Sequence, residues 1–330
     1  MLPVQVRRGA ALVLQLLASL AILGLLAWDA STETLLEAVK GWSIPLVLLA
    51  LAAKSAALAL HEYRLWLALP SPRPAVRKTV VIGFVSGAMH TILPARGGDA
   101  VAFGLLRQQL GVRASTAAYA VGMAAFFEAA VFGAMVLFAL AYSAPEWHSA
   151  QDIHARAVKW VTAATLFGTL ALVMAGIAGR RLAGTDQPEE EGFSFREFLT
   201  EGLRHTGKGI SDRRYVLLNL AIAAVEVWLM VESFAIGLEA AGIDTPSPWT
   251  LSALVLGLSA VAAVALPPTY GAGPAAASVF ILSLFGVSQE AALSYSALWW
   301  VLSQVPAAVF GIPCLWLLRR PEGSQEKNPS

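Results

Sequence analysis

The sequence predicts an all-α membrane protein with about six full transmembrane helices and two re-entrant helical hairpins. The chain of 330 residues is 57% hydrophobic and only 14% charged, whereas soluble domains carry about 25% charged residues. Its apolar residues gather in long runs of the length that crosses a bilayer. Two further apolar runs are each interrupted by a Leu-Pro dipeptide followed by glycines, which predicts broken helices rather than full spans.

Six apolar runs are long enough to span the membrane. The first follows two arginines and is longer than the roughly 7–15 residues of a signal-peptide core, so we interpret it as an uncleaved span. We expect the spans at residues 9–28, 44–69, 114–142, 158–178, 215–241 and 291–318. Residues 1–330 then form a single integral membrane domain. The polar segment 180–214 is expected to be a cytoplasmic loop with a surface helix over 193–203, and the polar tail 321–330 to be disordered.

The first interrupted run centres on the sequence LPARGGD, residues 93–99. The apolar stretches on either side, 79–93 and 100–110, fall short of the roughly 20 residues that a spanning helix needs. Broken backbone at membrane depth is tolerated only where it is buried in protein or lines a wet cavity. We therefore predict a hairpin that enters the membrane, breaks at its proline and returns. Arg96 and Asp99 would lie within the membrane, where a charge costs at least ~2.5–3.5 kcal/mol.

The second interrupted run has the sequence LPPTYGAG, residues 266–273, and its flanks resemble those of the first. Gly111 and Gly286 each lie between an apolar residue and a valine, at corresponding distances from the two breaks. We therefore predict an internal repeat, with copies at about residues 44–143 and 215–318. Short apolar segments interrupted by Gly and Pro at matching positions of two halves indicate a transporter site.

The arginines and lysines predict the orientation of the chain. Placing Arg7 and Arg8 in the cytoplasm puts nearly all other basic residues, Arg64 included, on the same side, as the positive-inside rule requires. Both termini are then cytoplasmic. The first hairpin enters from the cytoplasm and the second from the opposite side. The repeats have inverted topology, an arrangement suited to alternating access.

The first break and its continuation, LPARGGDAVAFGLLRQQLGV, resemble the signature of the lysylphosphatidylglycerol synthase/flippase transmembrane family. The second break, with its continuation GVSQEAAL, resembles the second motif of the family. The likeness covers about residues 44–318 and implies a lipid-translocase-like fold in a bacterial inner membrane. The residues that match the family pattern are Pro94, Arg96, Gly98, Asp99 and Glu128.

The chain departs from the family pattern at three places. Ala102 and Ala129 stand where the family usually has arginines, and the run from Pro274 to Ala277 stands where it often has a glutamate. These departures leave the lipid headgroup open. No stretch resembles the soluble aminoacyl-transfer domain of the large synthases, which implies a stand-alone membrane member.

We expect the substrate to bind at the two breaks. Arg96 would hold a lipid phosphate through two hydrogen bonds, assisted by the amide end of the half-helix that begins near Gly98. The alternative is that Arg96 and Asp99, three residues apart, pair with each other and only hold the loop. The predicted substrate-binding residues are Pro94, Arg96, Gly97, Gly98, Asp99, Glu128, Pro267, Gly271 and Gly273.

Charged residues are also expected deep in the spans, at Lys54, Glu128 and Glu226. Intramembrane charges usually pair with one another, so these residues either stabilise the helix bundle or form a proton or counter-ion relay beside the lipid path. Lys54 and Glu226 are the candidate relay residues. His90, just before the first break, is expected to cap a helix end.

The sequence lacks the nucleotide-binding, hydrolase and zinc-protease motifs. We therefore expect no enzyme activity, no cofactor and no metal site, and transport that is passive or ion-coupled. A lipid flippase or scramblase acting on an anionic headgroup is the favoured function. The alternatives are a transporter of a hopanoid or polyprenyl-linked cargo, and a scaffold for a lipid-synthesis enzyme that docks on 180–214. The expected partners are membrane lipids, such an enzyme or a second copy of the chain, and not nucleic acid.

Overall fold

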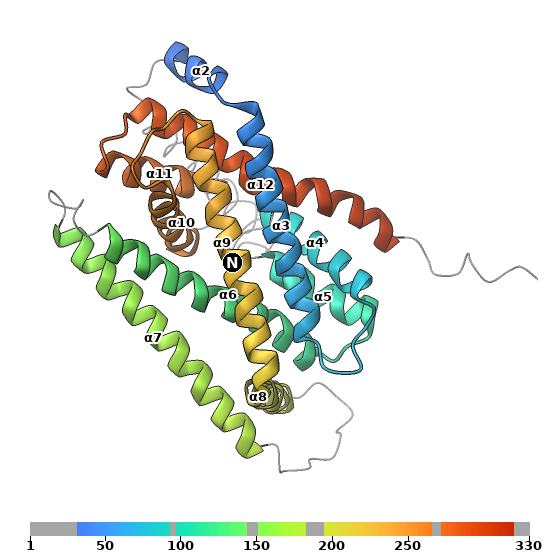
Figure 1. Ribbon diagram of the computed structural model, residues 1–330. Coiled ribbons are helices and arrows are strands. Elements are labelled where there is room, and N and C mark those ends of the chain that lie inside the picture. The colour runs from blue at the N-terminus through green and yellow to red at the C-terminus, as the bar shows by residue number, and fades with distance from the viewer. Residues whose placement is uncertain (1–31, 93–96, 144–150, 183–194, 266–271, 320–330) are drawn as a thin grey trace, which may run out of the picture. The chain divides into compact units, whose positions relative to one another are not determined.

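The computed structural model describes residues 32–92, 97–143, 151–182, 195–265 and 272–319, and within them every regular element is an α-helix (Figure 1). This confirms the all-α class. The helices are α2 (Thr32–Lys40), α3 (Ile44–Ala68), α4 (Val76–Ile92), α5 (Gly97–Leu110), α6 (Ala114–Tyr142), α7 (Gln151–Leu182), α8 (Phe195–Ser211), α9 (Arg213–Ala240), α10 (Pro248–Ala265), α11 (Ala272–Leu284) and α12 (Gln289–Arg319).

Among the described residues, five helices are long and apolar enough to cross a membrane. They are α3, α6, the stretch Ala155–Arg181 of α7, α9 and the stretch Gln289–Leu318 of α12. These helices confirm five of the six predicted spans and the polytopic membrane class. The predicted first span, 9–28, and the tail, 321–330, lie outside the described residues.

The chain divides into two compact units, each made of three separate segments. Unit 1 comprises Met1–Ala57, Glu128–Ala171 and Ala224–Ser303, and unit 2 comprises Leu58–Phe127, Leu172–Ala223 and Gln304–Ser330. Each unit contains one pair of short helices that pack against each other: α10 and α11 in unit 1, and α4 and α5 in unit 2.

Unit 1 has a buried core to which α3, α6, α9, α10, α11 and α12 all contribute. The Phe234 ring stacks on Trp299, with 5.5 Å between ring centroids. The fully buried Tyr295 donates a hydrogen bond from its hydroxyl to the Phe234 carbonyl at 3.2 Å. Gly237 lets α12 approach α9, because a Cβ there would lie 2.9 Å from a methyl group of Leu302. α11, which follows the second break, contributes Ile281 and Leu282 to this core.

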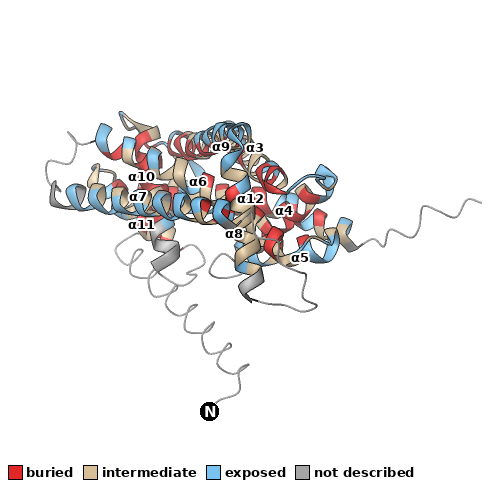
Figure 2. Cartoon of the chain, turned by 90° about the horizontal axis from the view of Figure 1, so that it is seen from below, coloured by how far each residue is buried: buried red, intermediate tan, exposed pale blue. Residues whose placement is uncertain are grey.

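The surface of α7 is largely apolar and exposed (Figure 2). Trp160 and Phe167 are each 75% exposed, and Leu166 and Leu170 are also exposed. Soluble monomers rarely expose a continuous apolar surface of this kind. In a membrane protein these side chains face lipid, which agrees with α7 as a spanning helix.

Unit 2 packs α4 against α5 and against the end of α12. Ile82 and Val85 of α4 and Leu106 of α5 are buried. The Phe84 ring stacks on Phe310 of α12, with 5.2 Å between centroids. A Cβ at Gly311 would lie 2.4 Å from the Phe84 carbonyl oxygen, so the α12 backbone directly contacts α4.

The two aligned glycines after the short helix pairs have the same conformation. Gly111 follows α5 with a φ of 65°, and Gly286 follows α11 with a φ of 78°. This left-handed conformation commonly ends a helix and favours glycine because it has no Cβ. The next long helix, α6 or α12, begins three residues after each glycine. The backbone thus turns in the same way after both pairs.

The polar regions contain more helix than the sequence predicted. The fourth long helix was predicted over 158–178, but α7 runs from Gln151 to Leu182. The surface helix was predicted over 193–203 and the remainder of 180–214 as loop, but α8 continues to Ser211. The physical reason is packing: Gly207 lies so close to α7 that a Cβ there would be 2.7 Å from the Gly179 carbonyl carbon. This contact stabilises a glycine-containing segment as helix.

The left-handed backbone conformation of Gly111 and Gly286 can be tested by alanine substitution. Gly111→Ala and Gly286→Ala should each lower the free energy of unfolding by about 1–2 kcal/mol, the cost of a left-handed L-residue. Gly104→Ala in α5 is the matched control, because a Cβ has open space at all three positions. The control should be neutral or stabilising, since alanine favours a helix interior. Equal melting temperatures for all three variants, measured in detergent, would contradict the assigned backbone conformation.

Candidate functional site

The first break is described from Gly97 onward, where α5 begins. Gly98 is buried against α4: a Cβ would lie 2.4 Å from the Ser86 carbonyl oxygen. The Ser86 hydroxyl donates a hydrogen bond to the Gly98 carbonyl at 2.8 Å. Only glycine fits at position 98, and its contact with α4 fixes the start of α5. The predicted residues Pro94 and Arg96 lie outside the described residues.

Asp99 lies in the first turn of α5 and contacts the last turn of α4. Its carboxylate Oδ1 is 3.2 Å from His90 Nε2, and the two side chains are 29% and 32% exposed. We expected His90 to cap its helix, and the structure places its ring against Asp99 across the helix pair. This contact joins the two helices beside the break. His90 is thus one partner of Asp99, and Arg96, its partner in the alternative interpretation, lies outside the described residues.

The second break is described from Ala272 onward, where α11 begins. The predicted residue Gly273 is buried there, and Pro274 occupies the first turn, where a missing backbone N–H does no harm. The Ser296 hydroxyl of α12 donates hydrogen bonds to the Ala275 carbonyl at 3.4 Å and to its own helix. The start of α11 is thus held against α12. The predicted Pro267 and Gly271 lie outside the described residues.

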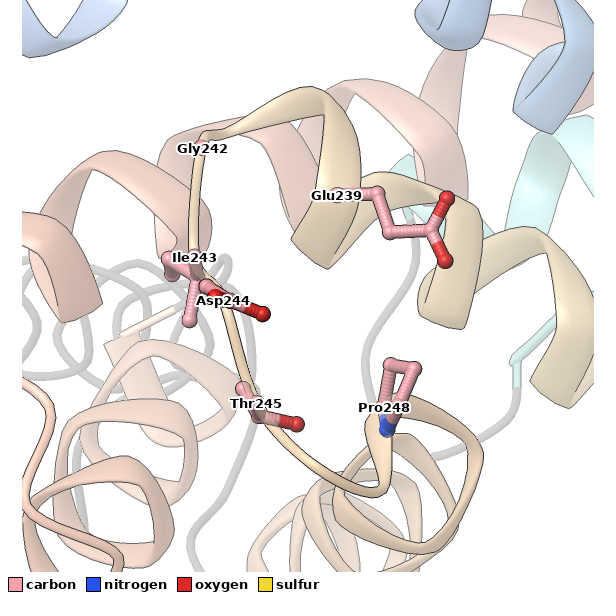
Figure 3. Close-up of a pocket in the computed structure, with 6 residues that line it drawn as sticks. All are labelled: Glu239, Gly242, Ile243, Asp244, Thr245 and Pro248. Atoms are coloured by element: carbon pink, nitrogen blue, oxygen red, sulfur yellow. The ribbon is translucent and has the colours of Figure 1, made fainter.

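A pocket of about 340 Å³ lies where α9 connects to α10 (Figure 3). The chain leaves α9 at Gly242, with a φ of 72°, and Ile243 N–H donates to the Leu238 carbonyl at 3.0 Å. The charged groups that line the pocket are the carboxylates of Glu239 and Asp244. None of the predicted site residues lines it, so it is separate from the predicted site.

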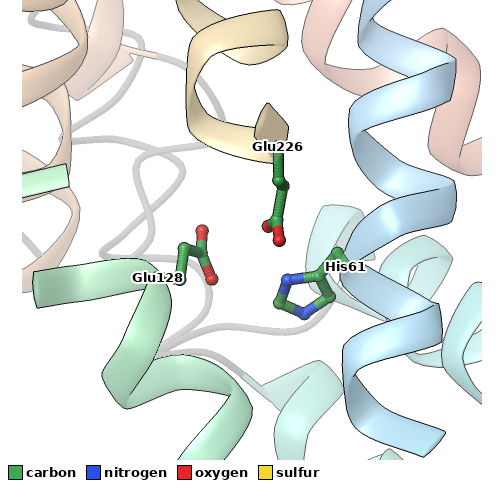
Figure 4. Close-up of side chains that lie close together, drawn as sticks. All are labelled: His61, Glu128 and Glu226. Carbon is green, nitrogen blue, oxygen red and sulfur yellow. The ribbon is translucent and has the colours of Figure 1, made fainter. Parts of the chain in front are cut away.

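Lys54, Glu128 and Glu226 come together within unit 1, from α3, α6 and α9. The two carboxylates offer oxygen atoms within 4.8 Å of each other and point into the same space (Figure 4). The Lys54 ammonium interacts electrostatically with both and lies 5.5 Å from the centre of the Phe234 ring. Glu226 is 4% exposed. The structure thus brings together the three charged residues that the sequence places deep in the spans.

Two buried charged residues of unit 2 were missed by the sequence analysis. Arg64, which we counted among the cytoplasmic charges, is fully buried, and Glu62 is 2% exposed. The Arg64 guanidinium donates a hydrogen bond to the Ala124 carbonyl of α6, and Glu62 lies against Gly83 of α4. The available signal was their position on a largely apolar helix, eight residues (62 − 54) and ten residues (64 − 54) after Lys54.

Comparison with known families identifies the chain. The family model for the lysylphosphatidylglycerol synthase TM region matches residues 12–311. The chain belongs to this family. The match includes both breaks and confirms the resemblance seen in the two motifs, and it extends through most of the predicted first span. As a member of this family, the chain corresponds to the membrane region of the synthases. No curated protein matches the chain significantly.

The charge cluster of unit 1 predicts a specific pattern of stability. Lys54→Met leaves Glu128 and Glu226 facing each other without their ammonium, and removal of one partner of a buried ion pair costs about 3–5 kcal/mol. Adding Glu226→Gln to this variant should restore part of the loss, because one of the two carboxylate charges is removed. Melting temperatures in detergent measure both effects.

The exposed Lys40 provides the matched control for loss of a lysine charge. Lys40→Met should leave the melting temperature within about a degree of the unaltered protein, as surface substitutions do. Equal stability of Lys54→Met and Lys40→Met would show that Lys54 does not compensate the two carboxylates.

Proposed function

We propose that the chain is a lipid flippase or scramblase that moves a lipid with an anionic headgroup across the membrane by alternating access around two re-entrant loops. The observation that carries the proposal is the presence in each unit of one packed pair of short helices with a Gly/Pro break between them. Membership in a family named for the membrane region of a lipid synthase supports a lipid as the cargo. The proposed setting is a bacterial inner membrane, with both termini in the cytoplasm.

The lengths of the short helices support re-entry rather than crossing. α5 has 14 residues and α11 has 13, which correspond to roughly 20 Å at helical rise. The hydrocarbon core is roughly 30 Å thick, so neither helix spans it alone. An internal repeat is supported by the equivalent glycine turns after α5 and α11. Discontinuous helices in inverted repeats commonly carry the substrate site of transporters.

An anionic headgroup suits the first break. The start of α5 presents backbone amides and the positive end of a helix dipole, and Gly98 holds that end against α4. Arg96, immediately before α5, is assigned to the lipid phosphate, because a guanidinium forms two parallel hydrogen bonds with it.

The charge cluster of unit 1 is proposed to couple transport to a cation. Glu128 and Glu226 lie near the middle of α6 and α9, so they fall near mid-membrane if these helices span. Two carboxylates and one ammonium carry one net negative charge. Uptake of one proton or monovalent cation neutralises this charge, and its release restores the attraction to Lys54. Because the cluster can gain and lose one positive charge in this way, Lys54 and Glu226 are assigned as relay residues.

One observation at the α4–α5 pair favours an alternative cargo. Ala102 is 3% exposed in α5, so its surroundings leave little room for the arginine that the family usually has there. The site then carries one cation fewer than the corresponding site of family members that have an arginine at this position. A hopanoid or polyprenyl-linked cargo, with less headgroup charge, is therefore the alternative.

A translocation assay tests the proposed function. Liposomes with the purified chain and fluorescent phosphatidylglycerol are treated with a membrane-impermeant quencher, which reaches the inner-leaflet lipid only if translocation occurs. Arg96→Ala should abolish translocation, and Arg96→Lys should restore only part of it, because lysine keeps the charge but loses the two-pronged geometry. Arg107→Ala, an exposed arginine of the same helix pair, is the matched control and should behave like the unaltered protein.

Stability measurements on the same variants separate the two roles of Arg96. A lipid ligand at position 96 predicts that Arg96→Ala melts like the unaltered protein, whereas a structural pair predicts that Arg96→Ala and Asp99→Asn are destabilised alike. Wild-type translocation by Arg96→Ala would refute the site. Translocation of a polyprenyl-linked lipid but not of phosphatidylglycerol would support the alternative cargo, and translocation of neither would support a scaffold.

A further inference from the structure

The last turns of α7 cross α8 in direct backbone contact within unit 2. A Cβ at Gly207 of α8 would lie 2.7 Å from both the Gly179 carbonyl carbon and the Arg180 nitrogen of α7. A Cβ at Gly176, one turn earlier, would lie 2.9 Å from a methyl group of Ile210. Glycines on both helices permit this close approach. As a result, two cations that are distant in the sequence, Arg180 and Lys208, flank the same crossing.

A pocket of about 450 Å³ opens at this crossing, within the usual size range of small-molecule sites. It is lined by Arg180, Gly207, Lys208, Ser211 and Asp212.

The charge of this pocket is positive. Asp212, its one acidic residue, already accepts hydrogen bonds on Oδ1 from the amides of Arg214 and Tyr215, at 3.0 and 3.2 Å, and so caps α9. Among the residues that the structure describes, neither Arg180 nor Lys208 has a carboxylate within ion-pair distance. Within the described residues, the two cations and the carboxylate of Asp212 give this pocket a net charge of +1 (2 − 1).

The position of the pocket indicates which anion would balance its positive charge. The candidate span of α7 ends at Arg181, beside the pocket, and basic residues at the end of a span lie at the depth of the lipid headgroups. α8 carries apolar residues on one face and charged residues on the other, as a helix that lies on the membrane surface does. A guanidinium and an ammonium on one pocket match a phosphate, the first by its fork and the second as a point charge.

We propose that this pocket binds the phosphate of an anionic phospholipid and thereby holds α8 against the end of α7. The site shares no residue with the breaks, so it stands independently of the transport proposal. Its acyl chains would lie along the exposed apolar side chains of α7, such as Val173 and Met174. The bound lipid acts as a structural ligand, whereas the lipid at the breaks is the cargo.

Native mass spectrometry of the full chain in neutral detergent tests the proposal. The probes are dioleoyl phosphatidylglycerol and, for comparison, zwitterionic dioleoyl phosphatidylcholine. All variants carry Arg96→Ala, which removes the phosphate ligand proposed for the first break. Arg180→Gln/Lys208→Gln should weaken binding of phosphatidylglycerol by about 25-fold, since each juxtamembrane cation contributes about fivefold. Phosphatidylcholine should bind weakly both to the Arg96→Ala protein and to the Arg96→Ala protein that also carries Arg180→Gln/Lys208→Gln.

Two controls make the result specific. Arg77→Gln/Arg107→Gln removes the same charge from exposed positions on α4 and α5 and should retain full binding. The charge-preserving exchange Arg180→Lys/Lys208→Arg should also retain most of it, which guards against loss of binding through misfolding. Unchanged binding by Arg180→Gln/Lys208→Gln, or equal binding of the two lipids, would overturn the proposal. Displacement of the lipid by excess inorganic phosphate would assign the pocket to free phosphate instead.

Discussion

Charges inside an apolar bundle need counter-charges, and this constraint organises the middle of unit 1. Lys54, Glu128 and Glu226 come from three different helices and meet at one place. Because a buried charge without a partner is costly, the cluster fixes the register of α3, α6 and α9 relative to one another within the unit. The apolar side chains around Phe234 and Tyr295 then pack in a bundle in which the charge cluster has already set the positions of α3, α6 and α9.

The backbone obeys a parallel constraint at the breaks. A helix that ends within a membrane leaves amide and carbonyl groups that must find partners inside the protein. At the first break, Ser86 supplies a donor to the Gly98 carbonyl, and at the second, Ser296 supplies one to the Ala275 carbonyl. Serines on neighbouring helices thus tie the first turns of both short helices to an adjacent helix.

The sequence predicted the long helices well because their signal is compositional. Apolar runs of bilayer length need no knowledge of tertiary contacts, and five predicted spans correspond to long helices of the structure. α8 was predicted too short because its end contains Gly207 and Gly209, and only the contact with α7 shows why these glycines are helical. The burial of Arg64 was missed for a similar reason: its acceptor, the Ala124 carbonyl, is sixty residues away in the sequence.

The candidate site was predictable in its residue types but not in its pairings. Depth along each helix follows from the sequence, and so Lys54, Glu128 and Glu226 were identified as intramembrane charges. Which of them meet depends on helix rotation, which the nearly uniform apolar pattern of these spans does not encode. The contact between His90 and Asp99 likewise required the packing of α4 on α5.

The central claim is that the two breaks are reached from opposite sides of the membrane. Side-specific labelling tests it most directly, with Ala95→Cys or Thr269→Cys introduced into a Cys314→Ser background, which has no other cysteine. A membrane-impermeant thiol reagent is applied to right-side-out and to inverted vesicles. The account predicts that position 269 is labelled in right-side-out vesicles and position 95 in inverted ones. Labelling of both positions from the same side would contradict the inverted arrangement and the alternating-access mechanism built on it.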